Sequence, residues 1–342
     1  MKPYARPSRS QPRKPSRWRK PLLWGLAALA VAAVLAFIVF IAAYFRADQP
    51  VEALAARWGQ PPSTFVQVGG EDGARVHLRD TGPRDDPTPL LLIHGSASGL
   101  HTWDAWADAL AQQRRVVMLD LPGFGLTGPV GDDNYGVARQ VRLLTELMDV
   151  LGLRRVIVVG HGFGGALAWQ LAYAHPERVS RMVLIAAEGY PTQPWQVPLE
   201  QRVMDTPPLN WLGLITRPRW LVQRSVAQQF ANPQRVTDEL VDRYVELPLR
   251  DGNRRAQLLR LEQNRYLAQS ERIRALTLPT LILWGEQDRQ APSEQARWFE
   301  RDIRGARAVI LPGVGHLPQE EAPEAALAEL TMFLAGDPPD VP

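Results

Sequence analysis

The sequence predicts an α/β fold: a mostly parallel, doubly wound sheet with a helical cap insertion, preceded by one N-terminal transmembrane helix. Short apolar runs alternate with helical stretches of about 10–15 residues, which is the pattern of βαβ units in a parallel sheet. The alternation stops between residues 191 and 275, where helical segments rich in Arg, Gln and Leu replace the strands. A run without charged residues, 21–45, precedes the alternating part.

These observations divide the chain of 342 residues into segments with different expected roles. A hydrophobic content of 45% permits one sizeable core at this length. The expected segments are a basic cytoplasmic tail (1–20), a transmembrane signal anchor (21–45), a short tether (46–62), two parts of one core (63–190 and 276–336), a helical cap (191–275) and a C-terminal tail (337–342).

The net charge of +3 does not describe a basic surface on the folded part. Residues 1–20 carry eight Lys and Arg and no acid, which leaves 31 basic against 36 acidic residues in the rest of the chain. A nucleic-acid-binding surface is therefore not expected. The absence of cysteine excludes disulfides and thiolate chemistry.

The apolar run 21–45 is long enough to span a bilayer, because about 24 helical residues extend roughly 36 Å. Trp24 and Tyr44 lie near its ends, where interfacial aromatics are usual. The basic tail before it predicts a cytoplasmic N-terminus and an extracytoplasmic domain. A cleaved signal peptide is the alternative, with Ala53-Leu54-Ala55 as a small-residue cleavage site, although the run exceeds the usual apolar region of such a peptide.

The core is expected to begin with a hairpin, whose strands 65–68 and 74–79 flank a glycine-rich turn. The continuous apolar run 89–93 is typical of a strand that is buried on both faces. The further expected strands are 115–119, 156–159, 181–187, 278–284 and 308–311, and the expected core helices are 103–113, 137–151, 164–174 and 322–335.

The turn after the strand 156–159 carries the most informative residue of the chain. It leads from an apolar strand into an Ala-rich helix and has Gly162 at its centre. A strand, a sharp Gly-x-x-x-Gly turn and a helix form the arrangement that lifts a reactive side chain above a sheet. At Gly162 there is no side chain to lift. The full turn is Gly160-His161-Gly162-Phe163-Gly164-Gly165.

Two further residues follow late strands in an informative order. Asp288 comes after the strand 278–284, and His316 comes after the strand 308–311. A turn centre, then an acid, then a histidine is the chain order of a hydrolase triad on a parallel sheet. His316 is expected to act as a general base, with its other ring nitrogen held by Asp288.

Together these motifs resemble the capped branch of the α/β-hydrolase family that includes epoxide hydrolases and meta-cleavage-product hydrolases. The resemblance runs from about Phe65 to Leu334. In this family the turn centre is a nucleophile, Ser or Asp, so Gly162 is the one departure. The motifs that carry the resemblance are His94-Gly95, Trp103, Asp120-Leu121-Pro122-Gly123-Phe124-Gly125, Gly160-x-x-x-Gly164-Gly165, Trp284-Gly285-x-x-Asp288 and Gly315-His316.

The resemblance implies a site and an activity. The backbone N–H groups of Ser96 and Phe163 would form the oxyanion hole, and the activity would be hydrolysis of a small hydrophobic ester or a related bond. No cofactor is implied, no cluster has the spacing of metal ligands, and the oligomeric state stays open. The residues expected to contact substrate are His94, Gly95, His161 and Trp103.

Gly162 leaves several functions open. Glycine tolerates the strained turn, but losing a triad member leaves only about 10³–10⁴-fold catalysis over water. His316 could activate a water in the vacated space, or the chain could bind a ligand under its cap without turnover. It could also be a variant of an active serine hydrolase. Ser96 carries the nearest hydroxyl that could substitute, and Ser98 follows it in the same turn.

A different class of function also fits the glycines. Gly160-x-Gly162-x-x-Gly165 matches a dinucleotide fingerprint between a strand and a helix, and Glu188 ends the next strand. Glu188 is 28 residues after Gly160, which is long for a ribose contact, and the motif lies several βα units into the sheet. Glu188 is alternatively a second candidate for the triad acid or a hinge of the cap.

Overall fold

The computed structural model describes residues 19–70, 73–191, 206, 210–264 and 270–336. Most of the expected basic tail, part of the expected cap and the expected C-terminal tail lie outside these residues. The chain divides into two units, residues 1–45 and the folded domain from Arg46 onward.

The first unit contains one long helix, α1 (Arg19–Tyr44). Its portion Leu23–Tyr44 has 22 residues and is apolar enough to cross a membrane, although a signal sequence would meet the same criteria. At 1.5 Å per residue this portion extends about 33 Å, which matches a hydrocarbon core of about 30 Å.

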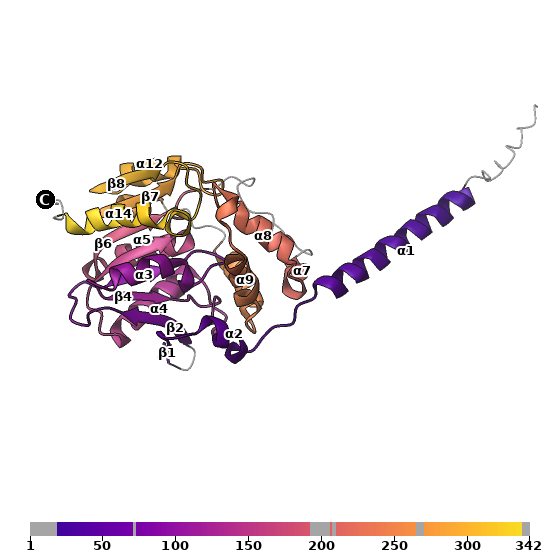
Figure 1. The fold of residues 1–342 in the computed structure, drawn as a ribbon, viewed down its shortest axis with the longest axis horizontal. Coiled ribbons are helices and arrows are strands. Elements are labelled where there is room, and N and C mark those ends of the chain that lie inside the picture. Colours follow the sequence, from indigo (N-terminus) through magenta and orange to yellow (C-terminus); the bar gives the residue numbers. More distant parts are fainter. Residues whose placement is uncertain (1–18, 71–72, 192–205, 207–209, 265–269, 337–342) are drawn as a thin grey trace, which may run out of the picture. The chain divides into compact units, whose positions relative to one another are not determined.

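The folded domain is built on an eight-stranded sheet of order β1-β2-β4-β3-β5-β6-β7-β8 (Figure 1). The hairpin β1–β2 and the pair β2–β4 are antiparallel, and every other neighbouring pair is parallel. The strands are β1 (Ser63–Val68), β2 (Ala74–Thr81), β3 (Leu90–Ile93), β4 (Val116–Leu119), β5 (Val156–His161), β6 (Val179–Ile185), β7 (Thr280–Gly285) and β8 (Ala306–Leu311).

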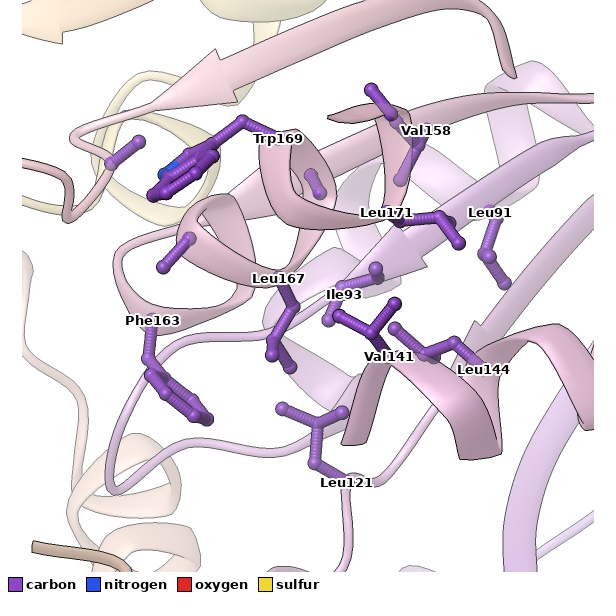
Figure 2. Packing of buried hydrophobic residues seen from close by; sticks show 14 of the residues in the cluster. Leu91, Ile93, Leu121, Val141, Leu144, Val158, Phe163, Leu167, Trp169 and Leu171 are labelled. Atoms are coloured by element: carbon purple, nitrogen blue, oxygen red, sulfur yellow. The ribbon is translucent and has the colours of Figure 1, made fainter. Parts of the chain in front are cut away.

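Helices cover both faces of the sheet, so the central strands are apolar on both sides. Leu91 and Ile93 of β3 pack with residues of α4 and α5 (Figure 2), whereas Leu90 and Leu92 pack toward α3 and α14. The core helices are α3 (Asp104–Leu110), preceded by the 3₁₀ turn η1 (Leu100–Trp103), α4 (Val137–Val150), α5 (Phe163–Ala174), α12 (Glu294–Asp302), α13 (Pro318–Glu321) and α14 (Pro323–Ala335).

The eight strands expected from the sequence are all present, and the predicted fold class is confirmed. Strand ends differ by a few residues from the expected ends. The clearest difference is β6, which stops at Ile185 instead of continuing to 187. Ala186 has φ 43°, and this left-handed conformation ends the extended backbone. The helix α12 was not predicted, because its sequence is charged and short of apolar residues.

Between β6 and β7 the described residues form helices joined by turns and loops, and Arg250 forms an isolated bridge with Gln49. The helices and turns are α7 (Asn210–Ile215), α8 (Arg219–Ala227), α9 (Asp238–Glu246), the 3₁₀ turn η5 (Leu247–Leu249), α10 (Asn253–Gln263) and α11 (Ser270–Arg274), with a short 3₁₀ turn η4 (Pro233–Arg235). An apolar cluster joins α8 and α9 to the core. Its buried members are Val222, Val226, Phe230, Tyr244 and Leu317, and Leu317 directly follows His316 in the chain.

The expected tether contains a helix, α2 (Val51–Trp58), that packs on the folded domain. Leu54 and Trp58 are buried against Leu126 and Leu247. Before the helix, the backbone of Gln49 pairs with residues 249 and 251, and Asp48 forms an ion pair with Arg254. The segment that follows α1 is therefore an ordered part of the folded domain from Arg46 onward.

Candidate active site

Gly162 forms the sharp turn between β5 and α5. Its backbone has φ 52° and ψ −117°, a conformation that is strained for any residue with a side chain. The Gly162 N–H donates to the carbonyl of Ile185 over 3.0 Å. The Gly162 carbonyl accepts from Ala166 at 3.1 Å and from Glu188 at 3.0 Å. These bonds hold the turn centre between β6 and the first turn of α5.

The glycines around the turn have different reasons for being glycine. A Cβ at Gly160 would lie 2.2 Å from the Gly164 carbonyl oxygen, and one at Gly165 would lie 2.5 Å from the Cβ of Ala187. A Cβ at Gly162, in contrast, would meet only the Cα of Gly95, at 3.7 Å. The flanking glycines permit close packing, while the space above Gly162 can accept a side chain.

His316 and Asp288 form a hydrogen-bonded pair at the site. Nδ1 of His316 lies 2.8 Å from Oδ2 of Asp288, whose side chain is fully buried. The other Asp288 oxygen accepts the N–H groups of Gln290 and Ala291, so the carboxylate is held in one orientation. Burial lowers the pKa of His316, but the charge and hydrogen bond of Asp288, with the charge of Glu188, outweigh it and raise that pKa. This arrangement suits a general base.

Neighbouring groups fix the backbone of His316. Its N–H donates over 2.7 Å to the carbonyl of Gln229, two residues after the end of α8. Its carbonyl lies 2.9 Å from Nε2 of His161, and the two rings meet edge to face with centroids 4.8 Å apart. Burial, followed by the charge of His316, holds the pKa of His161 well below its usual value. His161 is therefore a neutral donor that supports His316.

Two backbone N–H groups belong to residues next to the turn. Phe163 is the first residue of α5, and Ser96 lies in the loop after β3. Within the described part of the chain, neither N–H group has a hydrogen-bond acceptor. Ala97, next to Ser96, has φ 57°, a second strained position at the site. Free N–H groups at a helix start and a strained loop are suited to stabilise a developing negative charge.

Glu188 lies directly beside the turn and not at a distance from it. Its N–H donates to the Gly162 carbonyl, and its own carbonyl accepts from Nε1 of Trp169 over 2.9 Å. Burial raises the pKa of the Glu188 carboxyl, although the charges of Arg260 and His316 oppose this. The sequence predicted only that Glu188 follows the strand β6, and it left the role of this residue at the site open.

The sequence did not reveal Arg260, which comes from the cap helix α10. Its side chain is buried, with Cζ 4.7 Å from the ring centroid of Phe163 and 5.5 Å from that of Phe124. It therefore covers the residue that follows the turn centre. No sequence signal distinguishes it, because α10 contains three arginines at unremarkable positions.

The other residues that were expected to contact substrate make contacts within the protein. Nδ1 of His94 lies 2.7 Å from the Gly95 carbonyl, and its Nε2 accepts from Leu121. Trp103 is fully buried and packs on Trp106. Gly95 lies against the ring of His161, since a Cβ there would be 2.5 Å from Nδ1. The structure thus brings Gly95, His161 and His316 together, whereas Trp103 lies in the core.

The motif that begins at Asp120 organises the loop before the site. One oxygen of Asp120 accepts the N–H of Leu100, and the other accepts from Leu126 and lies 2.7 Å from Nδ1 of His77. Burial would raise the pKa of Asp120, but the charge of His77 and its hydrogen bond hold that pKa below its usual range. The buried, ionised carboxylate of Asp120 therefore links β2, η1 and the loop after β4 through its hydrogen bonds.

Ser98 is buried, and its hydroxyl has no hydrogen-bond partner by geometry among the described residues. The Tyr244 hydroxyl, from cap helix α9, is likewise buried without such a partner. In the described ranges, no group of three or more His, Asp or Glu side chains is arranged to hold a metal ion.

Comparison with known proteins gives a consistent result. Residues 88–323 match the model of a protein family described as alpha/beta hydrolase fold. A 2-hydroxymuconate semialdehyde hydrolase from Pseudomonas putida is 32% identical over 286 residues, which cover 80% of this chain and 96% of the relative. A 2-hydroxy-6-oxo-2,4-heptadienoate hydrolase, also from Pseudomonas putida, is 30% identical over 275 residues, covering 78% and 94%.

Solved structures are also similar over most of the chain. A membrane phospholipase A, described as a bacterial virulence factor, is 27% identical with a TM-score of 0.69, over 92% of this chain and 98% of that one. A meta-cleavage product hydrolase from Pseudomonas fluorescens also has a TM-score of 0.69, over 79% of this chain and 97% of that one. At 24% identity, this second likeness concerns the fold.

Proposed function

The chain belongs to the α/β-hydrolase family, and we propose that it is a membrane-anchored hydrolase of a small hydrophobic ester or a related bond. The observation that carries the proposal is the bond of 2.8 Å between His316 and Asp288. A buried carboxylate that fixes one imidazole nitrogen leaves the other available as a base. Retention of this pair beside Gly162 supports catalysis with water in place of a serine.

In this mechanism His316 removes a proton from a water that occupies the space above Gly162. The water attacks the acyl carbon, and the developing oxyanion accepts hydrogen bonds from the N–H groups of Ser96 and Phe163. His316 then returns the proton to the leaving oxygen. Because no covalent intermediate forms at Gly162, the rate is expected to be far below that of a serine hydrolase.

Three observations support the membrane anchor. Leu23–Tyr44 is long and apolar enough to span a bilayer, and a relative of known structure is described as a membrane phospholipase A. Cleavage after Ala55 would also remove half of α2, including the buried Leu54. The bilayer would then hold residues 21–45, with the N-terminus cytoplasmic and the folded domain extracytoplasmic.

One alternative function has an observation in its favour. Because Gly162 offers no nucleophile, the same fold could bind a small hydrophobic ligand under its cap without hydrolysing it. The dinucleotide function has less support, because close packing around the turn explains Gly160 and Gly165 without a nucleotide.

The substitution Gly162→Ser tests the proposal. A Cβ at this position meets only the Cα of Gly95, at 3.7 Å, so a serine fits without displacing a neighbour. The natural chain is expected to hydrolyse short-chain aryl esters slowly. In Gly162→Ser, kcat/KM is expected to rise by at least about 10³-fold, because a triad nucleophile would be restored.

Gly162→Ala is the matched control, since it adds the Cβ without the hydroxyl. Its methyl group enters the space that the mechanism assigns to the attacking water, so it should lower the slow activity, in contrast to the rise expected for Gly162→Ser. An inactive natural chain together with an inactive serine variant would reject the hydrolase and favour the binding protein. Labelling of the natural chain by a fluorophosphonate at Ser96 or Ser98 would instead reveal another serine nucleophile.

A further inference from the structure

An attacking water differs from a serine in a way that matters for this site. A serine hydroxyl has one proton, which its base accepts, whereas a water has two. In a buried site, an O–H group without an acceptor is costly and leaves the water free to rotate. If a water works above Gly162, as proposed, the site needs a second acceptor besides His316.

The backbone of Glu188 is fixed against the turn centre. Its N–H group donates to the Gly162 carbonyl over 3.0 Å, and Nε1 of Trp169 donates to its carbonyl over 2.9 Å. Two residues earlier, Ala186 holds the strained φ of 43°, which redirects the chain at the end of β6. Strain of this kind persists where the surrounding structure enforces it, and it is concentrated at functional sites.

The carboxylate of Glu188 is available to a ligand. Across the residues that the structure describes, it forms no hydrogen bond and no ion pair, although the side chain is only partly exposed. Its charge acts on His316 in the same site, and Arg260 from α10 is the other charged group that bears on it. Asp288, by comparison, is fully engaged by His316 and by the loop after β7.

We propose that the Glu188 carboxylate is the second acceptor for the attacking water, so that Glu188 and His316 together replace the missing serine. This inference rests on the proposed hydrolytic function. The water oxygen forms its bond to the acyl carbon while His316 takes one proton and the other O–H remains bonded to Glu188. When the bond to the leaving oxygen breaks, that oxygen receives the proton from His316. Ester and water become acid and alcohol, and Glu188 is unchanged.

The test compares Glu188→Ala in two backgrounds, the natural full-length chain and Gly162→Ser. In the natural chain, kcat/KM for a short-chain aryl ester is expected to fall by about 10- to 100-fold, the effect of losing a hydrogen bond to a charged acceptor. In Gly162→Ser, kcat/KM reports attack by the serine and is expected to change less than about threefold. Glu188→Gln keeps a neutral acceptor of the same size, so its kcat/KM is expected to lie between those of the natural chain and of Glu188→Ala.

Glu286→Gln is the matched control, because Glu286 is an exposed carboxylate on the neighbouring loop and its loss should affect neither background. Equal losses in both backgrounds would assign Glu188 a structural role and overturn the inference. An unchanged natural chain after Glu188→Ala would overturn it as well. A natural chain without any esterase activity would instead refute the proposed function from which the inference starts.

The pH dependence gives an independent readout. The charge of Glu188 helps to raise the pKa of His316, and Asp288 acts on the same ring. The charge of Arg260, from α10, opposes the rise in the pKa of Glu188. Only the neutral ring of His316 can take a proton from water, so kcat/KM of the natural chain should fall at acid pH. In Glu188→Gln the acid limb should move to lower pH, and a limb that stays in place would count against the assignment.

Discussion

Nδ1 of His316 and Oδ2 of Asp288 lie 2.8 Å apart, although 28 residues separate them in the chain. The Asp288 side chain is fully buried and that of His316 is 11% exposed, so the pair is shielded from bulk water. A carboxylate in this position fixes the imidazole tautomer and stabilises the imidazolium that forms when the other nitrogen takes a proton. The pair therefore predicts measurable behaviour whether water or a serine is the nucleophile.

The substitution Asp288→Asn is expected to lower kcat/KM in Gly162→Ser by roughly 10³- to 10⁴-fold, because an amide favours the wrong tautomer. In the natural chain the loss should have the same direction. The measurement is aryl-ester hydrolysis in both backgrounds. Asp108→Asn, at an exposed position on α3, is the control and should leave kcat/KM unchanged. An active Asp288→Asn variant would mean that another group orients His316.

The activity should depend on the protonation of His316. Its pKa is raised, since the charge and hydrogen bond of Asp288 and the charge of Glu188 outweigh burial, and only the neutral ring is a base. The rate constant kcat/KM is therefore expected to be level at alkaline pH and to fall as pH decreases through this raised pKa. Asp288→Asn should move the inflection to lower pH. The measurement is kcat/KM as a function of pH. A value of kcat/KM that falls toward alkaline pH would contradict the assignment of His316 as a general base.

Stability should fall at mildly acid pH because of a buried histidine outside the active site. Burial lowers the pKa of His101 from 6.5 to about 4, and its Nε2 is engaged with the Trp58 carbonyl. The unfolded chain takes up this proton near pH 6.5, before the folded chain does. The contribution is therefore complete above about pH 6.5 and is lost toward pH 4, by about 3 kcal/mol.

Urea unfolding at several pH values between about 7.5 and about 5 measures this loss. His101→Gln is expected to flatten the dependence, and His175→Gln, at a more exposed site, is expected to leave it unchanged. If both variants kept the full slope, other buried histidines would account for it.

The segment between α1 and the sheet should contribute to folding. Leu54 of α2 is 3% exposed and contacts Trp58, Leu126 and Leu247. Leu54→Ala removes a buried side chain and is expected to lower the free energy of unfolding by about 2–5 kcal/mol. Urea unfolding of the full chain in detergent measures it. Leu26→Ala, on α1 where Leu26 is 55% exposed, should not change the unfolding of the domain.

Much of the fold followed from local pattern. Continuous apolar runs predicted the strands, since a strand covered by helices on both faces has no polar side. The C-terminal end of β6 and the presence of α12 could not be predicted from local sequence pattern. Ala186 adopts a left-handed conformation that nothing in its type announces, and α12 buries only a few residues of a charged sequence.

For the site, the chemical groups could be read from the sequence alone. It supplied a turn without a nucleophile at Gly162 and placed Asp288 and His316 in loops after late strands, where parallel topology brings strand ends together. The residues that surround Gly162 become known only from the folded structure. It put Arg260 of the cap over Phe163 and Glu188 against Gly162, because these contacts depend on backbone strain and helix packing between distant segments, which no local pattern encodes.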